Sequence, residues 1–252
     1  MTVPQKRKNT RNKKESSGEM IVTRKANNWS ENYGYHNFKL TDSQKVLVNK
    51  ISENTLTFVD SVAGTGKSSA VMHYFAREYI RDTSKKIIVI RTPMEAGGMD
   101  KVGFLPNSLE EKVAIHFAST KKILEQMLTK GKVETDLGHR IHFKIPNFVL
   151  GETLDNSLIL IDEGQALQPM IMKLLLERTG VDSKVVVAGC SSQLYGSEST
   201  KRNGLKDALV RFFDENMEPR YDDIAFHKFE IDEIQRSEIV KTVVRAYSDY
   251  LN

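Results

Sequence analysis

The sequence contains a single cysteine, Cys190, and no long apolar run. One cysteine excludes an internal disulfide framework and is typical of proteins in a reducing compartment. No stretch approaches the roughly 20 apolar residues that a membrane-spanning helix needs. The N-terminus is basic but lacks the apolar segment of a secretory signal. We therefore expect a cytoplasmic globular protein without a membrane partner.

Beyond its first 20 residues, the chain also lacks an excess of charge of either sign. Residues 1–20 contain six Lys/Arg and two acidic residues, and the remaining residues carry equal numbers of both signs. The N-terminal tail, which we take as residues 1–26, contains few apolar residues, so we predict that it is disordered. Such an arm either adds salt-sensitive attraction to nucleic acid or is only a solvated terminus. Residues 27–252 are predicted to form one domain, because the chain is long enough for a sizeable core.

Short runs rich in Val and Ile alternate with helical patterns along this domain. Nearly continuous apolar strands are typical of a sheet buried on both faces, and the alternation favours parallel strands with right-handed crossovers. The pattern therefore predicts an α/β fold with a doubly wound, mainly parallel sheet. The expected strands are 55–60, 85–91, 157–163, 183–189 and 224–231, and the expected helices are 40–54, 67–80, 109–128, 168–180 and one from about Arg236.

The stretch SVAGTGKSS follows the first expected strand and opens a helix, as a phosphate-binding loop does. Gly64 and Gly66 let backbone N–H groups converge on phosphate oxygens. Lys67 would reach the β- and γ-phosphates, and the hydroxyl of Ser68 would bind Mg²⁺. Ser61 stands where this pattern usually has glycine, which is tolerated if its φ is negative. The loop residues expected to bind nucleotide are Ser61, Val62, Ala63, Gly64, Thr65, Gly66, Lys67, Ser68 and Ser69.

A pair of acidic residues ends the strand LILIDEGQ, at the sheet edge where such folds bind ligands. Asp162 is expected to hold Mg²⁺ through water, and Glu163 to orient the attacking water; a pair that merely caps a helix is the alternative. The intervening strand KIIVI (86–90) indicates the arrangement of additional-strand ATPases. The guanine-reading N/T-K-x-D pattern is missing after the pair, which favours ATP over GTP.

Seven motifs together resemble the PhoH-like family, whose members are single-domain ATPases related to the first motor domain of superfamily 1 helicases. The resemblance covers about residues 38–250 and implies a RecA-like core of the additional-strand type. The motifs are LTDSQ, AGTGKS, RTPMEAGGMDKVGFLP, LILIDEGQ, VVVAGCSSQL, NGLKDAL and IDEIQRSEIV.

The resemblance implies further site residues. Gln44 matches the glutamine that reads the adenine edge, a task that suits an amide because it both donates and accepts. Gln165 and Gln193 match glutamines that sense the γ-phosphate. Arg236 matches an arginine that contacts phosphate in its own site or a neighbour's, although a surface salt bridge is an alternative. Upstream aromatic residues stack on adenine or, as we favour, pack in the core; these are Tyr35 and Phe38.

Three positions are harder to interpret. By analogy with helicases, the segment 91–106 touches a nucleic-acid backbone, unless Arg91 simply braces this loop. Ser61 replaces the first glycine of the family's phosphate loop. Cys190 replaces the aspartate of the family's GDxxQ motif and so removes a carboxylate near the expected Mg²⁺. We expect this loss to slow hydrolysis or change its coupling, because a neutral thiol does not replace that charge.

The favoured function is a Mg²⁺-dependent ATPase coupled to RNA or single-stranded DNA. In superfamily 1 helicases two motor domains close around ATP. This chain has room for only one such domain, so the resemblance implies a homo-oligomer, such as a hexameric ring, in which a neighbouring subunit completes the site. A nucleotide-gated nucleic-acid-binding protein with little hydrolysis is the alternative. A small-molecule kinase is disfavoured, because no acceptor-binding lid follows the phosphate loop. A single compact domain with a basic tail is compatible with a phage-encoded protein.

Overall fold

A computed structural model describes residues 33–92, 109–192 and 203–248. Its centre is a six-stranded sheet in which every strand pair is parallel. The expected α/β fold is therefore confirmed. The strands are β1 (Leu56–Ser61), β2 (Lys86–Arg91), β3 (Ile141–Lys144), β4 (Ser157–Asp162), β5 (Lys184–Gly189) and β6 (Ile224–Phe229).

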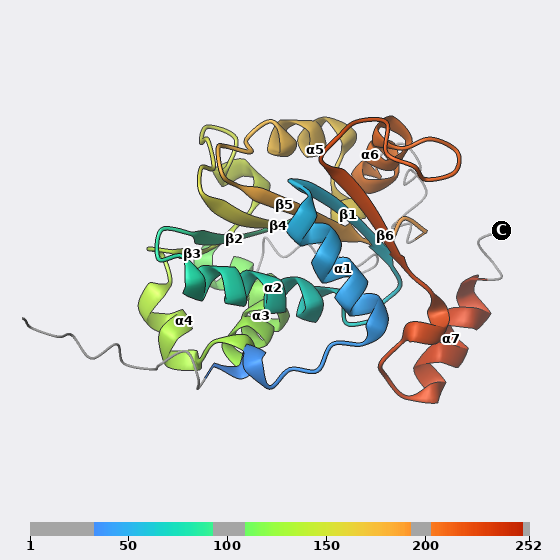
Figure 1. The fold of residues 1–252 in the computed structure, drawn as a ribbon, viewed down its shortest axis with the longest axis horizontal. Coiled ribbons are helices and arrows are strands. Elements are labelled where there is room, and N and C mark those ends of the chain that lie inside the picture. The colour runs from blue at the N-terminus through green and yellow to red at the C-terminus, as the bar shows by residue number, and fades with distance from the viewer. Residues whose placement is uncertain (1–32, 93–108, 193–202, 249–252) are drawn as a thin grey trace, which may run out of the picture.

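Helices cover both faces of the sheet, as its apolar strands require (Figure 1). One face packs against α1 to α4 through a core that includes Leu47, Phe75 and Leu124. The other face packs against α5 and α6 through a second core that includes Met172 and Leu209. The α-helices are α1 (Asp42–Glu53), α2 (Lys67–Arg81), α3 (Leu109–Met127), α4 (Lys130–Asp136), α5 (Pro169–Leu176), α6 (Gly204–Phe212) and α7 (Glu238–Ser248), and short 3-10 helices are η2 (Gly34–His36), η4 (Pro146–Phe148), η5 (Gly164–Ala166) and η7 (Ile231–Glu233).

The strand order, β3-β2-β4-β5-β1-β6, determines which loops meet. The strand between β1 and β4 in the sheet is β5, so our assignment of this place to KIIVI was wrong. KIIVI belongs to β2, which lies on the far side of β4. A strand is nevertheless interposed between β1 and β4, as in additional-strand ATPases. Because all strands are parallel, the C-terminal ends of β1, β2, β4 and β5 share one edge.

Two elements in the middle of the chain were not predicted. The short helix α4 and the edge strand β3 follow α3, where the sequence has no long apolar run. The strand β3 forms because it pairs with β2, in the register Ile87↔Ile141 to Ile90↔Lys144. Within the described ranges, no helix has the length and apolar character needed to cross a bilayer. The predicted tail, residues 1–26, lies outside the described residues.

Candidate nucleotide-binding site

The phosphate loop, residues 61–68, joins the end of β1 to the start of α2. Its two glycines have left-handed backbones, with φ of +92° at Gly64 and +80° at Gly66. Side chains other than glycine rarely adopt this region, so the loop depends on glycine at both positions. Gly66 is also the N-cap of α2, which directs unpaired backbone N–H groups of the first turn toward the loop. This arrangement suits a phosphate group.

Ser61 fits the loop without backbone strain. It has no positive φ, which is the condition that we set for a serine at this position. Its hydroxyl is buried, donates to the carbonyl of Val62 at 3.2 Å and accepts from the hydroxyl of Thr65 at 3.2 Å. The serine therefore adds a hydrogen bond across the loop that glycine cannot make.

Gln44 holds the loop from the side of α1. Its side-chain oxygen accepts from the N–H of Thr41, and the two residues form a capping box at the start of α1. Its side-chain nitrogen donates to the carbonyl of Thr65 at 3.1 Å. A Cβ added at Gly66 would lie 2.4 Å from this nitrogen, so glycine is also needed for close approach. Gln44 thus braces the loop, and its reading of adenine stays a prediction.

The two aromatic residues that precede α1, Tyr35 and Phe38, lie near α2. Tyr35, in η2, is buried in the core beside α2 and α3, and Phe38 packs against this core. Both rings lie near the ring of His73 on α2, with centroids 6.2 Å and 6.1 Å away. Their core packing agrees with the role that we favoured over adenine stacking.

The start of α2 places Lys67 and the two serines after it at the sheet edge. Lys67 is the first residue of the helix, followed by Ser68 and Ser69, and all three are half-buried. The charge of Lys67 acts on Asp162 and favours its ionised form. A lysine and a hydroxyl therefore accompany the loop glycines, as a phosphate site requires.

Asp162, the last residue of β4, is almost completely buried. The register pairs it with Arg91 of β2, and the Arg91 guanidinium lies 3.5 Å from its carboxylate. The hydroxyl of Thr120 on α3 donates to the same carboxylate oxygen at 3.4 Å. Burial raises the pKa of Asp162 above its ordinary value, while the charges of Arg91 and Lys67 oppose this rise. Such a desolvated carboxylate gains most from a further cation.

Glu163 has a left-handed backbone, with φ of 55° and ψ of 44°. This region is costly for a residue other than glycine, and such residues often occur at functional sites. Two side chains hold the carboxylate in this position: Arg91 at 3.3 Å and the amide nitrogen of Gln165 at 2.6 Å. Arg91 therefore contacts both members of the acidic pair, Asp162 and Glu163, and the prediction that it simply braces a loop missed this contact.

Gln165 links the ends of β4 and β5. Its amide nitrogen donates to Glu163, and its amide oxygen accepts from the backbone N–H of Cys190 at 3.1 Å. Cys190 follows β5 directly, and its thiol is buried 3.2 Å from the hydroxyl of Ser192. Gln165 thus links the backbone of Cys190 to the carboxylate of Glu163. Gln193 lies outside the described residues.

Arg236 reaches the phosphate loop of its own chain. The preceding residue, Gln235, donates its backbone N–H to the carbonyl of Gly64 at 2.8 Å. A Cβ added at Gly64 would lie 3.1 Å from the Cδ atom of Arg236, which shows how closely this side chain covers the loop. Its exposed guanidinium forms no ion pair with another described residue. The salt-bridge alternative therefore finds no partner in the described part of the chain.

Sequence reasoning missed Asp60 at the end of β1. Its carboxylate accepts from the backbone N–H of Ser191 at 2.8 Å and from the hydroxyl of the same residue. The carbonyl of Ser191 in turn accepts from Asn203, which caps α6. Asp60 thereby ties the strand before the phosphate loop to the segment after β5. An acidic residue directly before a phosphate loop was the available signal.

The side chains at this edge of the sheet include oxygen ligands of the kind that Mg²⁺ prefers. Magnesium prefers oxygen ligands and usually takes only one or two from protein, with phosphate oxygens and water supplying the others. A cage of three or more Asp, Glu, His or Cys side chains does not occur among the described residues. Ser68 and Asp162 are the protein groups that would hold the ion, and its charge would relieve the desolvated Asp162 carboxylate.

Comparison with known proteins identifies the family. A model of the "PhoH-like protein" family matches residues 38–248. The chain belongs to this family. The PhoH-like proteins of Mycobacterium leprae and of Mycobacterium tuberculosis strain H37Rv are 28% and 30% identical to this PhoH-like chain. Each alignment covers 83% of the chain, but only 58% and 57% of the respective relative. The chain therefore spans a little over half the length of these relatives.

A solved structure supports the fold of this PhoH-like chain. The large terminase of a thermophilic bacteriophage matches 82% of the chain and 50% of its own length. Its TM-score is 0.50 and its sequence identity is 12%. At this identity the likeness concerns the fold alone, an α/β fold built on a parallel sheet.

Proposed function

We propose that this protein binds ATP with Mg²⁺ at the edge formed by β1, β2, β4 and β5 and hydrolyses it. The observation that carries the proposal is the position of Glu163. Its strained backbone and its contacts with Arg91 and Gln165 fix a carboxylate at the edge that holds the phosphate loop. A carboxylate fixed in this way suits the orientation of an attacking water.

The other site residues have separate tasks in this proposal. Loop N–H groups and Lys67 bind the phosphates, and Ser68 and Asp162 hold Mg²⁺, whose charge stabilises the transferred phosphoryl group. Gln165 and Gln193 sense the γ-phosphate, and Gln44 binds adenine. Arg236, which covers Gly64, neutralises charge that develops during transfer.

Arg91 offers a route from this site to nucleic acid. Its guanidinium contacts both Asp162 and Glu163. A bound Mg²⁺ would compete for Asp162 and weaken that contact. Arg91 leads directly into the segment 91–106, for which we propose contact with an RNA or single-stranded DNA backbone. The basic tail, residues 1–26, would add affinity for either nucleic acid. We further propose that the protein acts in the cytoplasm as a homo-oligomer, with residues 27–252 as its single domain.

Two observations favour a second candidate, a nucleotide-gated binding protein with little hydrolysis. Cys190 stands in place of the carboxylate of the family's motif, and Arg91 contacts both members of the acidic pair and offsets part of their negative charge. Turnover that nucleic acid stimulates would argue against this candidate. A phage-encoded origin stays a prediction, since the relatives named above are bacterial.

The test is ATP hydrolysis measured with and without Mg²⁺ and with single-stranded RNA or DNA. We expect Glu163→Gln to lower kcat by about 100-fold or more while ATP still binds, since general-base groups contribute on this scale. Lys67→Ala should abolish both turnover and tight binding. Equal turnover in the native protein and in both variants would refute the proposed hydrolysis. Tight ATP binding by the native protein without turnover would favour the second candidate.

A further inference from the structure

The last helix, α7, presents an apolar stripe that no other described part of the chain covers. Ile239, Val243 and Tyr247 follow each other at a spacing of four, so they share one face of the helix. They are 66%, 48% and 72% exposed. The charged side chains of α7 lie elsewhere, where Lys241 pairs with Glu238 and Arg245 pairs with Asp232 of η7. An amphipathic helix with one uncharged, apolar face of this kind is typical of helices that bind in a groove.

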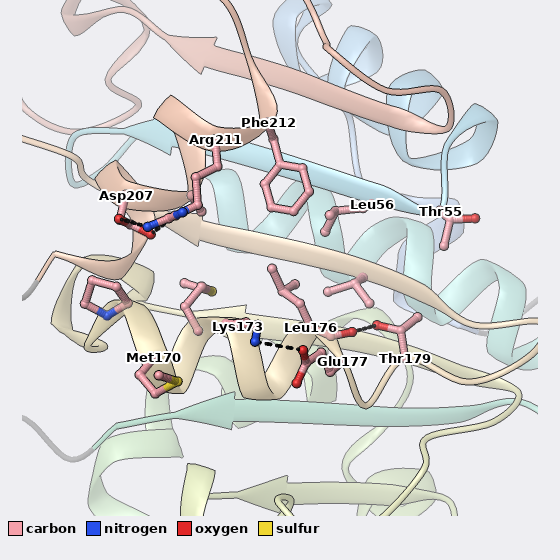
Figure 2. Close-up of a pocket in the computed structure, with 14 residues that line it drawn as sticks. Thr55, Leu56, Met170, Lys173, Leu176, Glu177, Thr179, Asp207, Arg211 and Phe212 are labelled. Atoms are coloured by element: carbon pink, nitrogen blue, oxygen red, sulfur yellow. Dashed lines mark hydrogen bonds and ion pairs between the residues drawn. The ribbon is translucent and has the colours of Figure 1, made fainter.

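A groove of matching character lies between α5 and α6 (Figure 2). Its volume is about 940 Å³, and its floor is formed by the starts of β1 and β5. Charged groups line its rim, but each is already paired with a neighbour in the sequence: Lys173 of α5 with Glu177, which follows this helix, and Arg211 with Asp207 on α6. The apolar lining residues include Leu56, Met170, Leu176, Val185, Ala208 and Phe212.

The α7 helix is kept away from the groove of its own chain. Only Arg236 and Ser237 separate its first residue from Gln235, which is bonded to Gly64. Gly64 follows the C-terminal end of β1, whereas Thr55 and Leu56 of the groove lie at the opposite end of this strand. Figure 1 shows α7 at the end of β6, on the opposite side of the sheet from α5 and α6. Occupation of its own groove would break the contact with Gly64.

We propose that α7 of one copy docks in the α5–α6 groove of a second copy. The two surfaces are compatible in charge, because both the apolar stripe of α7 and the floor of the groove are uncharged. The rim ion pairs are internal to each partner, so docking desolvates no unpaired charge. Stripe and groove are different surfaces, so the contact is head-to-tail and repeats from copy to copy. This inference deepens the proposed homo-oligomer and rests on it, but it does not depend on hydrolysis.

The docked helix would connect two nucleotide sites. At one end, α7 is two residues from Gln235 and Arg236, which contact the phosphate loop of its own chain. At the other end, the groove helix α5 begins shortly after Gln165, which holds Glu163 in the neighbouring copy. Each interface would thus join the phosphate loop of one copy to the acidic pair of the next.

The test measures the mass of the full chain in solution by light scattering, with and without ATP and Mg²⁺. Two variants each damage one surface at an exposed position: Val243→Glu on α7 and Met170→Glu in the groove. We expect the native protein to associate and each variant alone to be monomeric. An equimolar mixture should form dimers only, because it retains one intact stripe facing one intact groove. Ile115→Glu, at an exposed position on α3, should associate like the native protein.

A native protein that is monomeric under every condition would overturn the inference. So would variants that associate as well as the native protein, or a mixture that stays monomeric. Circular dichroism of each variant verifies that it is folded. Turnover, with Lys67→Ala as its control, is measured separately. Association without turnover would therefore refute the proposed hydrolysis alone, and turnover without association would refute the interface alone.

Discussion

At the scale of single residues, the site depends on side chains that position others. Arg91 and Gln165 hold Glu163, and Gln44 holds the phosphate loop through Thr65. Cys190 is the exception, because its backbone N–H bonds to Gln165 while its buried thiol adds no charge. This backbone contact does not depend on the Cys190 side chain, so replacing the thiol by a carboxylate tests the effect of charge at this position.

We predict that Cys190→Asp has opposite effects on stability and on turnover. A carboxylate buried here without a bound cation should lower the free energy of unfolding by about 2 kcal/mol. With ATP and Mg²⁺ bound as proposed, the same carboxylate would supply a negative charge near the ion, so turnover should rise. Urea titration and an ATP assay measure the two effects. Cys190→Ser, which adds no charge, is the control. Unchanged turnover in Cys190→Asp would show that this position does not limit hydrolysis.

At the scale of elements, β6 and α1 are joined by a buried histidine. His227 on β6 lies 3.1 Å from the hydroxyl of Ser43 on α1. Burial, assisted by the charge of Lys50, lowers the pKa of His227 to about 4. This contact helps to fix the start of α1, where Gln44 meets the phosphate loop. The packing of β6 on α1 therefore influences the nucleotide site.

We predict that His227 makes stability fall in mild acid. Between its unfolded pKa of 6.5 and its folded pKa of about 4, the unfolded chain binds a proton that the folded protein does not. The free energy of unfolding should therefore fall as the pH drops through this window, by about 2 kcal/mol at pH 4.5. In His227→Gln this part of the decline should vanish.

Urea titrations at pH 7 and pH 4.5 measure this difference. His139→Gln, at an exposed position, is the matched control and should behave like the native protein. An equal decline in the native protein and in His227→Gln would contradict the assignment.

At the scale of the whole molecule, charge separates the folded body from its N-terminal tail. Residues 1–20 have six basic and two acidic residues, whereas the rest of the chain is balanced. The side chains described at the sheet edge come from residues 44 to 236. Nucleotide turnover and long-range attraction to nucleic acid are thus assigned to different parts of the chain.

We predict that deletion of residues 1–26 weakens nucleic-acid binding but leaves basal ATP turnover unchanged. The tail releases counterions when it binds phosphates, at roughly 0.7 per neutralised charge on a single strand. Residues 1–26 carry eight basic and two acidic residues, so the slope of log K against log salt should become shallower by up to about 4. Binding titrations at several salt concentrations measure this slope. An unchanged slope would identify the tail as a solvated terminus.

The sequence by itself determined the class of fold and the nucleotide loop. Apolar strands alternating with helices indicate a buried parallel sheet, and Gly64, Gly66 and Lys67 indicate a phosphate loop. Both are local patterns, because the periodicity of a strand and the backbone of a glycine depend on few neighbours. The acidic pair was equally visible, because it ends an apolar strand.

Only the tertiary structure decided which strands are neighbours and which side chains meet. The sequence does not reveal that β5 separates β1 from β4, because strand order depends on how the crossovers pack. Nor does it reveal that Arg91 contacts both acidic residues or that Asp60 binds Ser191, which is 131 positions away. Contacts across such separations form when several elements pack at once, so no local pattern encodes them.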